Sequence, residues 1–367
     1  MASPKRKSDK FLLFLIIFLV FYGLLILASA SLVKSQNLFN ENYYYLKHQL
    51  LFGVLIGSGL FLVGSKVHYN IWQKSSFFIF LGSLVLLGLL FLPQFGLKIR
   101  GATRWIEFGG FSFQPAEFVK IAFVIYLSAW LAKKGKEMKS FSKTIFPFLI
   151  LNALLGIFFL LQPDMGSFLV ILGCSLLLFF LAGGSIKHIA GMSLIGIILL
   201  LLLIVLSPYR LPRLKSFLSP EENALSSSYQ VRQSIIGIGS GGLLGKGYGQ
   251  SFQKKGYLPE AIGDSVFVIL VEELGFVAGA VLVIGFLVLS FKGFRIAKRS
   301  PNNFSALLAS GISALIVYQA FINIAAISGI IPLTGITLPL VSYGSSSYIM
   351  TLFSLGILFN ISTHTKS

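Results

Sequence analysis

Two carboxylates lie where a long polar segment meets an apolar one, at residues 258–264. Asp264 directly precedes the apolar run, and Glu260 lies one helical turn before it if a helix begins near Pro259. A carboxylate at this boundary can take a proton from a hydroxyl group if its pKa and geometry suit the reaction. We therefore predict that Asp264 is a general base. The alternative role is capping of the helix that follows.

A second pair of charges, Glu117 and Lys120, lies in an otherwise apolar stretch that begins with Pro115. Proline suits the first turn of a helix, and a spacing of three residues puts both charges on one helical face. Ionisable groups at membrane depth are costly and mark functional sites by default. The pair is thus either a structural ion pair or part of the lining of a substrate cavity. Asp164, farther along, either caps a helix or belongs to the site.

The composition indicates a polytopic membrane protein. Of the 367 residues, 55% are hydrophobic and only 11% are charged, and the mean hydropathy is +0.85. A soluble domain usually carries about 25% charged residues, so an ordinary soluble enzyme is excluded. The 37 glycines suit helices that pack closely in lipid.

Ten segments are apolar and long enough to cross a bilayer, which takes about 20 residues. The sequence therefore predicts an all-α integral membrane protein, with one polytopic domain over residues 1–367 and one long extracytoplasmic loop at about 208–263. The predicted spans are about 11–33, 47–67, 76–94, 115–133, 144–161, 166–183, 187–207, 264–291, 303–330 and 342–361. The first span has a longer apolar core than the about 7–15 residues of a signal peptide, so we expect it to stay uncleaved.

The basic residues predict the orientation. With ten spans both termini lie on one face, and 17 of the 30 Lys and Arg residues then fall in short segments on that face. Such segments stay in the cytoplasm, so both termini are predicted to be cytoplasmic. Topology explains most of the net charge of +18, so it does not indicate a nucleic-acid partner. Two outer segments hold Lys98, Arg100, Arg104, Arg210, Arg213, Lys215, Arg232, Lys246, Lys254 and Lys255. These would attract an anionic ligand or, alternatively, anionic lipid headgroups.

Other residue types point to few further sites. Cys174 is the single cysteine and the four histidines are scattered, so neither a disulfide framework nor a zinc site is expected. The glycine-rich stretch 237–249 lacks a Walker pattern, although its backbone N–H groups could approach phosphate oxygens. Glu272 and Glu273, deeper in the eighth span, are expected to hydrogen-bond to neighbouring helices.

Seven motifs, taken together and in this order, resemble those of the SEDS family (shape, elongation, division and sporulation), the RodA and FtsW proteins of bacterial wall synthesis. The resemblance covers nearly the whole chain, and the stretch 229–260 is closer to the FtsW branch. The motifs are residues 101–106, 114–120, 162–166, 229–234, 257–261, 272–275 and 339–344.

The resemblance implies an inverting peptidoglycan glycosyltransferase that polymerises lipid II, a disaccharide-pentapeptide on undecaprenyl diphosphate, at the outer leaflet of the bacterial cytoplasmic membrane. Asp264 matches the family's catalytic aspartate and would deprotonate the GlcNAc 4-hydroxyl. Outer cations would stabilise the diphosphate leaving group. The implied substrate-binding residues and candidate cations are Arg104, Glu117, Lys120, Lys246, Lys254, Lys255, Glu260 and Ser342.

The resemblance also implies partners. A divalent cation, Mg²⁺ or Mn²⁺, could share the stabilisation of the phosphate charge, although no compact metal motif is present, and no organic cofactor is expected. The implied protein partner is a class B penicillin-binding protein, a transpeptidase that would dock through the membrane helices and the long outer loop. Membrane lipids surround the spans.

The chain departs from the family pattern at a few positions. Ile262 and Gly263 lie where Thr and often His precede the aspartate, and loss of a hydroxyl there could change the orientation or pKa of Asp264. His48 lies where Arg is common, and Ser345 lies where Gly is usual.

Two alternative functions differ in what they predict. A lipid II flippase would carry charges along a path through the bilayer and would have two related halves, whereas the charges here gather at the outer rim. A non-catalytic scaffold for a transpeptidase would keep polymer synthesis unchanged when Asp264 is replaced by asparagine.

Overall fold

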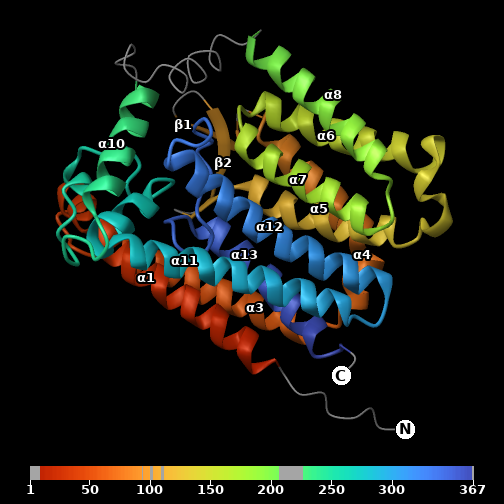
Figure 1. Cartoon of the computed structure of the whole chain (residues 1–367), viewed down its shortest axis with the longest axis horizontal. Coiled ribbons are helices and arrows are strands. Elements are labelled where there is room, and N and C mark those ends of the chain that lie inside the picture. The colour runs from red at the N-terminus through yellow and green to blue at the C-terminus, as the bar shows by residue number, and fades with distance from the viewer. Residues whose placement is uncertain (1–8, 93, 100–101, 109–110, 206–225, 366–367) are drawn as a thin grey trace.

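A computed structural model describes residues 9–92, 94–99, 102–108, 111–205 and 226–365 (Figure 1). Most of the first third of the predicted outer loop, at 208–225, lies outside these residues. Several basic residues used above also lie outside them, namely Arg100, Arg210, Arg213 and Lys215.

The chain folds into helices joined by short turns, with one small sheet. The elements are α1 (Lys10–Phe39), α2 (Tyr44–His48), the π-helical η1 (Gln49–Leu55), α3 (Ile56–Lys66), α4 (Tyr69–Leu89), β1 (Gly96–Ile99), β2 (Ala102–Phe108), β3 (Phe111–Phe113), α5 (Pro115–Leu131), η2 (Gly135–Lys139), η3 (Phe141–Ile145), α6 (Phe146–Leu161), α7 (Met165–Leu181), α8 (Ile186–Val205), α10 (Ser226–Ser240), η4 (Gln253–Lys255), α11 (Val266–Lys298), α12 (Asn303–Ile327) and α13 (Ser345–Ser362).

The predicted class, an all-α membrane protein, is confirmed. Seven described helical segments are long and apolar enough to span a membrane: Lys10–Phe39, Tyr44–Lys66, Tyr69–Leu89, Phe141–Leu161, Val266–Lys298, Asn303–Ile327 and Ser345–Ser362. Shorter apolar helices occupy Met165–Leu181 and Ile186–Ile198. Each of the ten predicted spans contains a helix, and the crossing of the membrane by α5, α7 and α8 stays a prediction.

The last two helices form the centre of the bundle. In the most apolar stretch of α13, 83% of the residues are buried, and in that of α12 the share is 72%. In the helical segment Tyr44–Lys66 the corresponding share is 17%. α13 packs against α3, and α12 packs against α11, α7 and α5. Close packing of α13 on α3 depends on glycine: a Cβ on Gly356 would lie 2.3 Å from the carbonyl oxygen of Phe61. Small residues allow this approach where lipid supplies no hydrophobic driving force.

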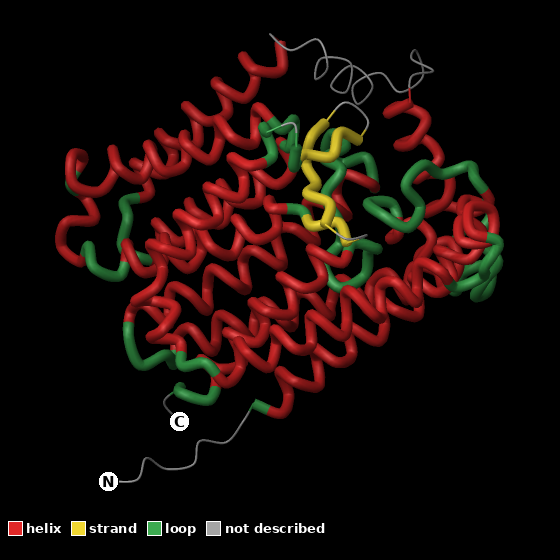
Figure 2. Tube along the Cα trace, turned by 180° about the vertical axis from the view of Figure 1, so that it is seen from behind, coloured by secondary structure: helices red, strands yellow, loops and turns green. Residues whose placement is uncertain are grey.

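A three-stranded antiparallel sheet precedes α5, where the sequence suggested only a loop. β2 pairs with both β1 and β3, with Ile106 opposite Phe113. Figures 1 and 2 show the sheet on one side of the molecule and both termini on the opposite side. The strands are short and mix charged with apolar residues, which is why hydropathy alone missed them.

The eighth predicted span is broken. α11 begins at Val266 instead of 264, and Gly275 interrupts it with φ 79° and ψ −178°. The segment 241–247 satisfies the freed backbone groups, because the Phe276 N–H donates to the Gly242 carbonyl (2.9 Å) and the Gly247 N–H donates to the Glu273 carbonyl (2.9 Å). Irregular backbone within a membrane protein is tolerated only where protein supplies such partners.

Replacing Gly275 by alanine is expected to destabilise the protein. A Cβ at this position would lie 2.3 Å from the Leu243 carbonyl oxygen, and the positive φ is itself unfavourable for alanine. We expect a clear loss of apparent Tm in detergent, measured by scanning fluorimetry. The matched control is Gly82→Ala, because a Cβ on Gly82 meets no atom within 4 Å, and a helix gains about 0.5–1 kcal/mol from this change. Equal Tm values for the two variants would contradict the steric argument.

Candidate active site

Asp264 lies in the turn just before α11, and residues from two helices, α10 and α12, hold it. Gln230 of α10 donates a hydrogen bond from Nε2 to the Asp264 carboxylate at 3.3 Å and to the Ser265 hydroxyl at 3.0 Å. Asn323 of α12 donates to the backbone carbonyl of Asp264 at 2.9 Å. The side chain of Asp264 is half-buried, so it is oriented by the fold but still accessible.

Ser342 holds the backbone next to Asp264. Its hydroxyl donates to the Gly263 carbonyl at 2.6 Å and accepts from the Leu338 N–H at 2.8 Å. The neighbouring Tyr343 N–H donates to the Ile262 carbonyl at 2.8 Å. Ser342 is 4% exposed, so this residue positions the aspartate through the backbone.

Replacing Ser342 by alanine is expected to lower the free energy of unfolding by about 1–3 kcal/mol, because two buried backbone groups lose their partner. Thermal unfolding in detergent measures the loss. Ser342→Thr, which keeps the hydroxyl, is expected to recover part of it. An alanine variant as stable as the wild type would show that these hydrogen bonds contribute nothing.

The electrostatics of the site suit a base. Burial, and then the nearby Glu260 carboxylate, raise the pKa of Asp264 to about 6, against the smaller opposing effect of its hydrogen bonds to Gln230 and Ser265. The two carboxylates are therefore close, as predicted, but not through a helical turn. Residues 259–264 form turns, and Glu260 has a left-handed φ of 51°, because the helix begins only at Val266.

Arg104, at the middle of β2, holds the turn before α7. Its Nε donates to the Gln162 carbonyl at 3.0 Å, and a second guanidinium nitrogen donates to the Pro163 carbonyl. Asp164 caps α7, since its carboxylate accepts from the Ser167 N–H at 3.2 Å. The capping role considered for Asp164 is therefore present in the structure.

The turn before α7 lies near Asp264, with one segment of the chain between them. A Cβ on Gly166 would lie 3.0 Å from the Thr334 carbonyl oxygen, and a Cβ on Gly335 would lie 4.0 Å from the Asp264 carboxylate. The segment 334–336 thus separates the turn held by Arg104 from the aspartate. β2, α7, α11 and α12 converge at this place.

Several buried polar atoms near this junction have no hydrogen-bond partner among the described residues. They are Nε2 and Oε1 of Gln162, Oγ1 of Thr334 and Oδ1 of Asn323. An unsatisfied buried polar group calls for a partner such as water or a ligand. A sugar hydroxyl or an amide could supply such a partner.

Lys246 and Lys254, predicted to face substrate, each form an ion pair with a glutamate of α11; Lys254 is buried and Lys246 is exposed. Lys246 Nζ lies 2.8 Å from Glu272, and Lys254 Nζ lies 2.6 Å from Glu273. Ser29 of α1 also donates to the Glu273 carboxylate. The pairs join α1, the glycine-rich segment and α11.

The cluster bears on two expectations. Glu273 accepts a hydrogen bond from a neighbouring helix, as expected, through Ser29 of α1. The other partners of Glu272 and Glu273 come from the segment 246–254, which the helix break at Gly275 brings against α11. The backbone N–H groups of the glycine-rich stretch approach carboxylates and carbonyls of the protein: the Gly249 N–H donates to Glu273 at 3.0 Å. These N–H groups donate hydrogen bonds to residues beside the break in α11, so they are not available to bind a phosphate.

Glu117 and Lys120 form a buried ion pair that contacts α12 one helical turn from Asn323, the residue that binds the Asp264 carbonyl. Their charged atoms are 2.8 Å apart, and Lys120 also donates to Gln319 of α12 at 2.6 Å. The cavity beside them has a volume of about 10 Å³, which is near the least that one water molecule occupies. The structure therefore contains the ion pair, and a role of the two residues in lining a substrate cavity stays a prediction.

The structure thus groups Glu260 and Ser342 around Asp264 and places Arg104 one segment away. Sequence reasoning missed Gln230 and Asn323. Gln230 occurs in a motif to which no role was given, and Asn323 is a polar residue in an apolar span, which is the signal that could have identified it.

The side chains near Asp264 offer few ligands for a metal ion. Among the described residues, no group of three or more His, Cys, Asp or Glu side chains could hold a metal ion. Asp264 and Glu260 are two carboxylates without a third ligand, so the protein side chains described here do not form a metal site by themselves.

Known proteins match the chain over nearly its full length. The family model FtsW/RodA/SpoVE, described as cell cycle protein, matches residues 10–367. The stage V sporulation protein E of Bacillus subtilis is 37% identical, with all of both chains covered. The probable peptidoglycan glycosyltransferase FtsW of Coxiella burnetii is 39% identical, with 94% of this chain and 93% of that protein covered.

Solved structures have the same fold. A chain of a peptidoglycan synthase complex, studied for the coordination of polymerization and crosslinking, matches with a TM-score of 0.80 and 26% identity, covering 97% of each chain. The rod shape determining protein RodA of Thermus thermophilus matches with a TM-score of 0.72 and 26% identity, covering 98% of each chain. The chain, with its aspartate held at the start of α11, therefore belongs to the FtsW/RodA/SpoVE (SEDS) family.

Proposed function

We propose that this protein is a peptidoglycan glycosyltransferase that polymerises lipid II, with Asp264 as general base. The observation that carries the proposal is the half-buried carboxylate of Asp264, with Asn323 bonded to its carbonyl, Ser342 bonded to the carbonyl of Gly263 before it, and its pKa raised to about 6. A base near this pKa is deprotonated at neutral pH and still accepts a proton in the transition state. Relatives named probable peptidoglycan glycosyltransferase FtsW, 37–39% identical to the chain, support glycosyl transfer.

The reaction follows from this placement. Asp264 accepts the proton of a GlcNAc 4-hydroxyl while that oxygen forms a bond to the anomeric carbon of the second sugar. The bond from this carbon to the diphosphate oxygen breaks on the opposite face, so the anomeric configuration inverts and undecaprenyl diphosphate leaves with the bonding electrons. The one proton released ends on Asp264.

The developing charge on the diphosphate needs cations. Arg104 is the favoured candidate because it is half-buried and its guanidinium is anchored on the turn before α7. It lies beside Gln162, whose side chain has no hydrogen-bond partner among the described residues. Lys255 is the second candidate, since it is exposed and its Nζ lies 5.9 Å from the centre of the Phe252 ring. Lys246 and Lys254 are already paired with glutamates. We therefore assign them to the framework of the site.

The orientation follows the same proposal. Asp264 and the sheet would face the extracytoplasmic side, and both termini the cytoplasm, in agreement with the distribution of basic residues. A class B penicillin-binding protein is the proposed partner. The similar chain in a peptidoglycan synthase complex supports such an assembly.

The test is polymerisation of purified lipid II by the full-length protein with a class B partner, in parallel reactions with Mg²⁺, Mn²⁺ and a chelator. Glycan products are resolved by gel electrophoresis. Polymer that depends on this protein is the expected result. Movement of fluorescent lipid II across liposomes without polymer would favour a flippase, and a stable complex without polymer or transport would favour a scaffold.

A further inference from the structure

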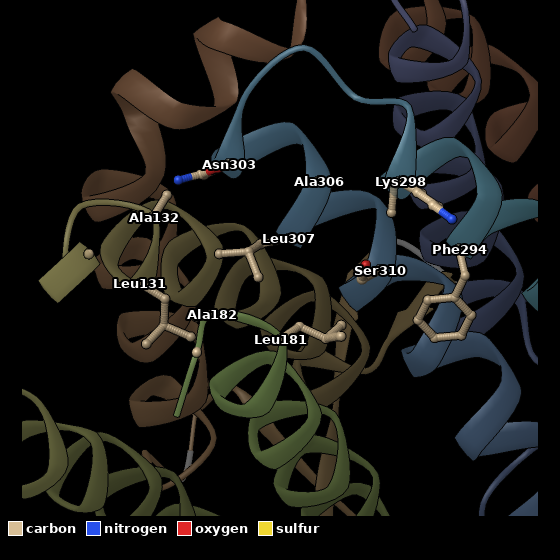
Figure 3. Close-up of a pocket in the computed structure, with 13 residues that line it drawn as sticks. Leu131, Ala132, Leu181, Ala182, Phe294, Lys298, Asn303, Ala306, Leu307 and Ser310 are labelled. Carbon is tan, nitrogen blue, oxygen red and sulfur yellow. The ribbon is translucent and has the colours of Figure 1, made fainter. Parts of the chain in front are cut away.

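A second cavity lies at the end of the bundle opposite Asp264. It has a volume of about 590 Å³ and lies between the ends of α5, α7 and α11 and the beginning of α12 (Figure 3). The ion pair of Lys292, late in α11, with Asp9, the cap of α1, places this end of α11 beside the N-terminus. The cavity therefore lies on the membrane face that carries the termini, and the glycosyl-transfer site described above does not include it.

The lining of this cavity is apolar at its centre and polar at its edge. Leu131, Leu181 and Leu307 come from three different helices, and Phe294 adds an aromatic ring (Figure 3). Lys298, at the end of α11, is the cationic residue of the lining and is exposed. Leu181 is 43% exposed, so the cavity is open to its surroundings. Volumes of about 300–1,000 Å³ are typical of small-molecule pockets.

The segments that border the cavity are strongly basic. Residues 132–145 and 292–303 carry nine Lys and Arg residues against one carboxylate, Glu137. That carboxylate is already paired with Lys143 at 2.7 Å. Asp9 pairs with Lys292, so seven of the nine basic residues have no ion-pair partner among the described residues. The uncompensated positive charge at the edge of an apolar cavity complements an amphiphile with an anionic head.

We propose that this cavity binds one anionic phospholipid of the membrane face on which the termini lie. Its phosphate would lie near Lys298, and part of an acyl chain would pack against Leu181, Phe294 and Leu307. Basic pockets between transmembrane helices on the cytoplasmic side bind anionic lipid headgroups in this way. A soluble anion would need the cations but not the apolar lining, which is why we favour a lipid.

The experiment uses the full-length protein in detergent, titrated with phosphatidylglycerol or with phosphatidylcholine, and counts bound lipid by native mass spectrometry. We expect saturable binding of one phosphatidylglycerol and weaker binding of phosphatidylcholine. Lys298→Gln is expected to weaken phosphatidylglycerol binding by about fivefold, the effect of one basic residue. Ala306→Phe, which fills the cavity, is expected to abolish the saturable site.

The matched control is Lys66→Gln, an exposed lysine at the end of α3, where Ser65 contacts Asn360 near the C-terminus. It lies on the same membrane face but outside the cavity lining, so we expect binding like that of the wild type. Equal losses in Lys298→Gln and Lys66→Gln would overturn the proposal in favour of diffuse surface attraction. Displacement of the lipid by soluble glycerol phosphate, or unchanged binding in a folded Ala306→Phe variant, would also overturn it.

Discussion

Replacing Asp264 by asparagine is expected to lower the rate of glycan polymerisation by about 10²–10⁴-fold, the usual contribution of a general base. Asparagine has nearly the same shape, and its side-chain oxygen can still accept the hydrogen bond that Gln230 donates at 3.3 Å. The loss would therefore report the missing basicity. Polymer is quantified from lipid II at matched amounts of folded protein and partner.

The outcome that contradicts this prediction is equal polymer from both proteins. The base would then be another group, and Glu260 is the nearest candidate because its charge already acts on Asp264. Glu260→Gln is the matched variant. If Asp264 is the base, Glu260→Gln keeps activity at neutral pH.

The same assignment predicts a pH profile. Since burial and the Glu260 charge raise the pKa of Asp264 to about 6, the rate is expected to fall as the pH drops through about 6, where the base becomes protonated. Glu260→Gln removes the like charge and is expected to move this acidic limb to lower pH. A limb that does not move would show that another group titrates.

The raised pKa also has a consequence for stability. A carboxyl group whose pKa is higher in the folded than in the unfolded state destabilises the fold once it is ionised, so stability falls as the pH rises from about 4 to 6. Asp264→Asn is therefore expected to raise the apparent Tm at pH 7.5 and not at pH 4. The gain is at most about 3 kcal/mol, from a shift of roughly two pKa units. If Asp264→Asn is inactive but more stable than the wild type, its loss of activity comes from the missing base and not from misfolding.

The second large effect is expected at the buried ion pair. Lys120→Met leaves the Glu117 carboxylate, 7% exposed, without its cation, and breaks the hydrogen bond to Gln319. Removing one member of a buried pair costs about 3–5 kcal/mol. We expect a large loss of apparent Tm and of folded yield in detergent.

The double variant Glu117→Gln/Lys120→Met separates the two interpretations of this pair. A purely structural pair predicts that the double variant regains stability and polymerises lipid II, whereas a substrate contact predicts a stable protein without activity. The matched control is Lys143→Met, since the Lys143–Glu137 pair has a similar length of 2.7 Å but side chains 62% and 45% exposed. Exposed pairs contribute about 0–1 kcal/mol, so a loss equal to that of Lys120→Met would contradict the role of burial.

Properties that depend on local composition were predictable from the sequence. The apolar runs identify a membrane protein because each span must itself be apolar and long enough to cross the hydrocarbon layer, with its backbone groups hydrogen-bonded within the helix. Because acidic residues are few, Asp264 and the Glu117–Lys120 pair could be identified as candidate functional residues. The order of the motifs indicated the family. The sheet before α5 was missed because its strands are short and have no clear periodicity.

Contacts between distant residues were decided only by the tertiary structure. The sequence predicted that Lys246 and Lys254 face a phosphate, but the break at Gly275 folds the glycine-rich segment against α11 and pairs both lysines with glutamates. Ser29 and Glu273 are 244 residues apart and still share a hydrogen bond. Hydropathy and charge are properties of a segment, so the membrane fold and the choice of Asp264 as candidate base could be predicted without knowledge of tertiary contacts. Which charged residues form ion pairs depends on how the helices pack, and packing brings together residues that are far apart in the sequence.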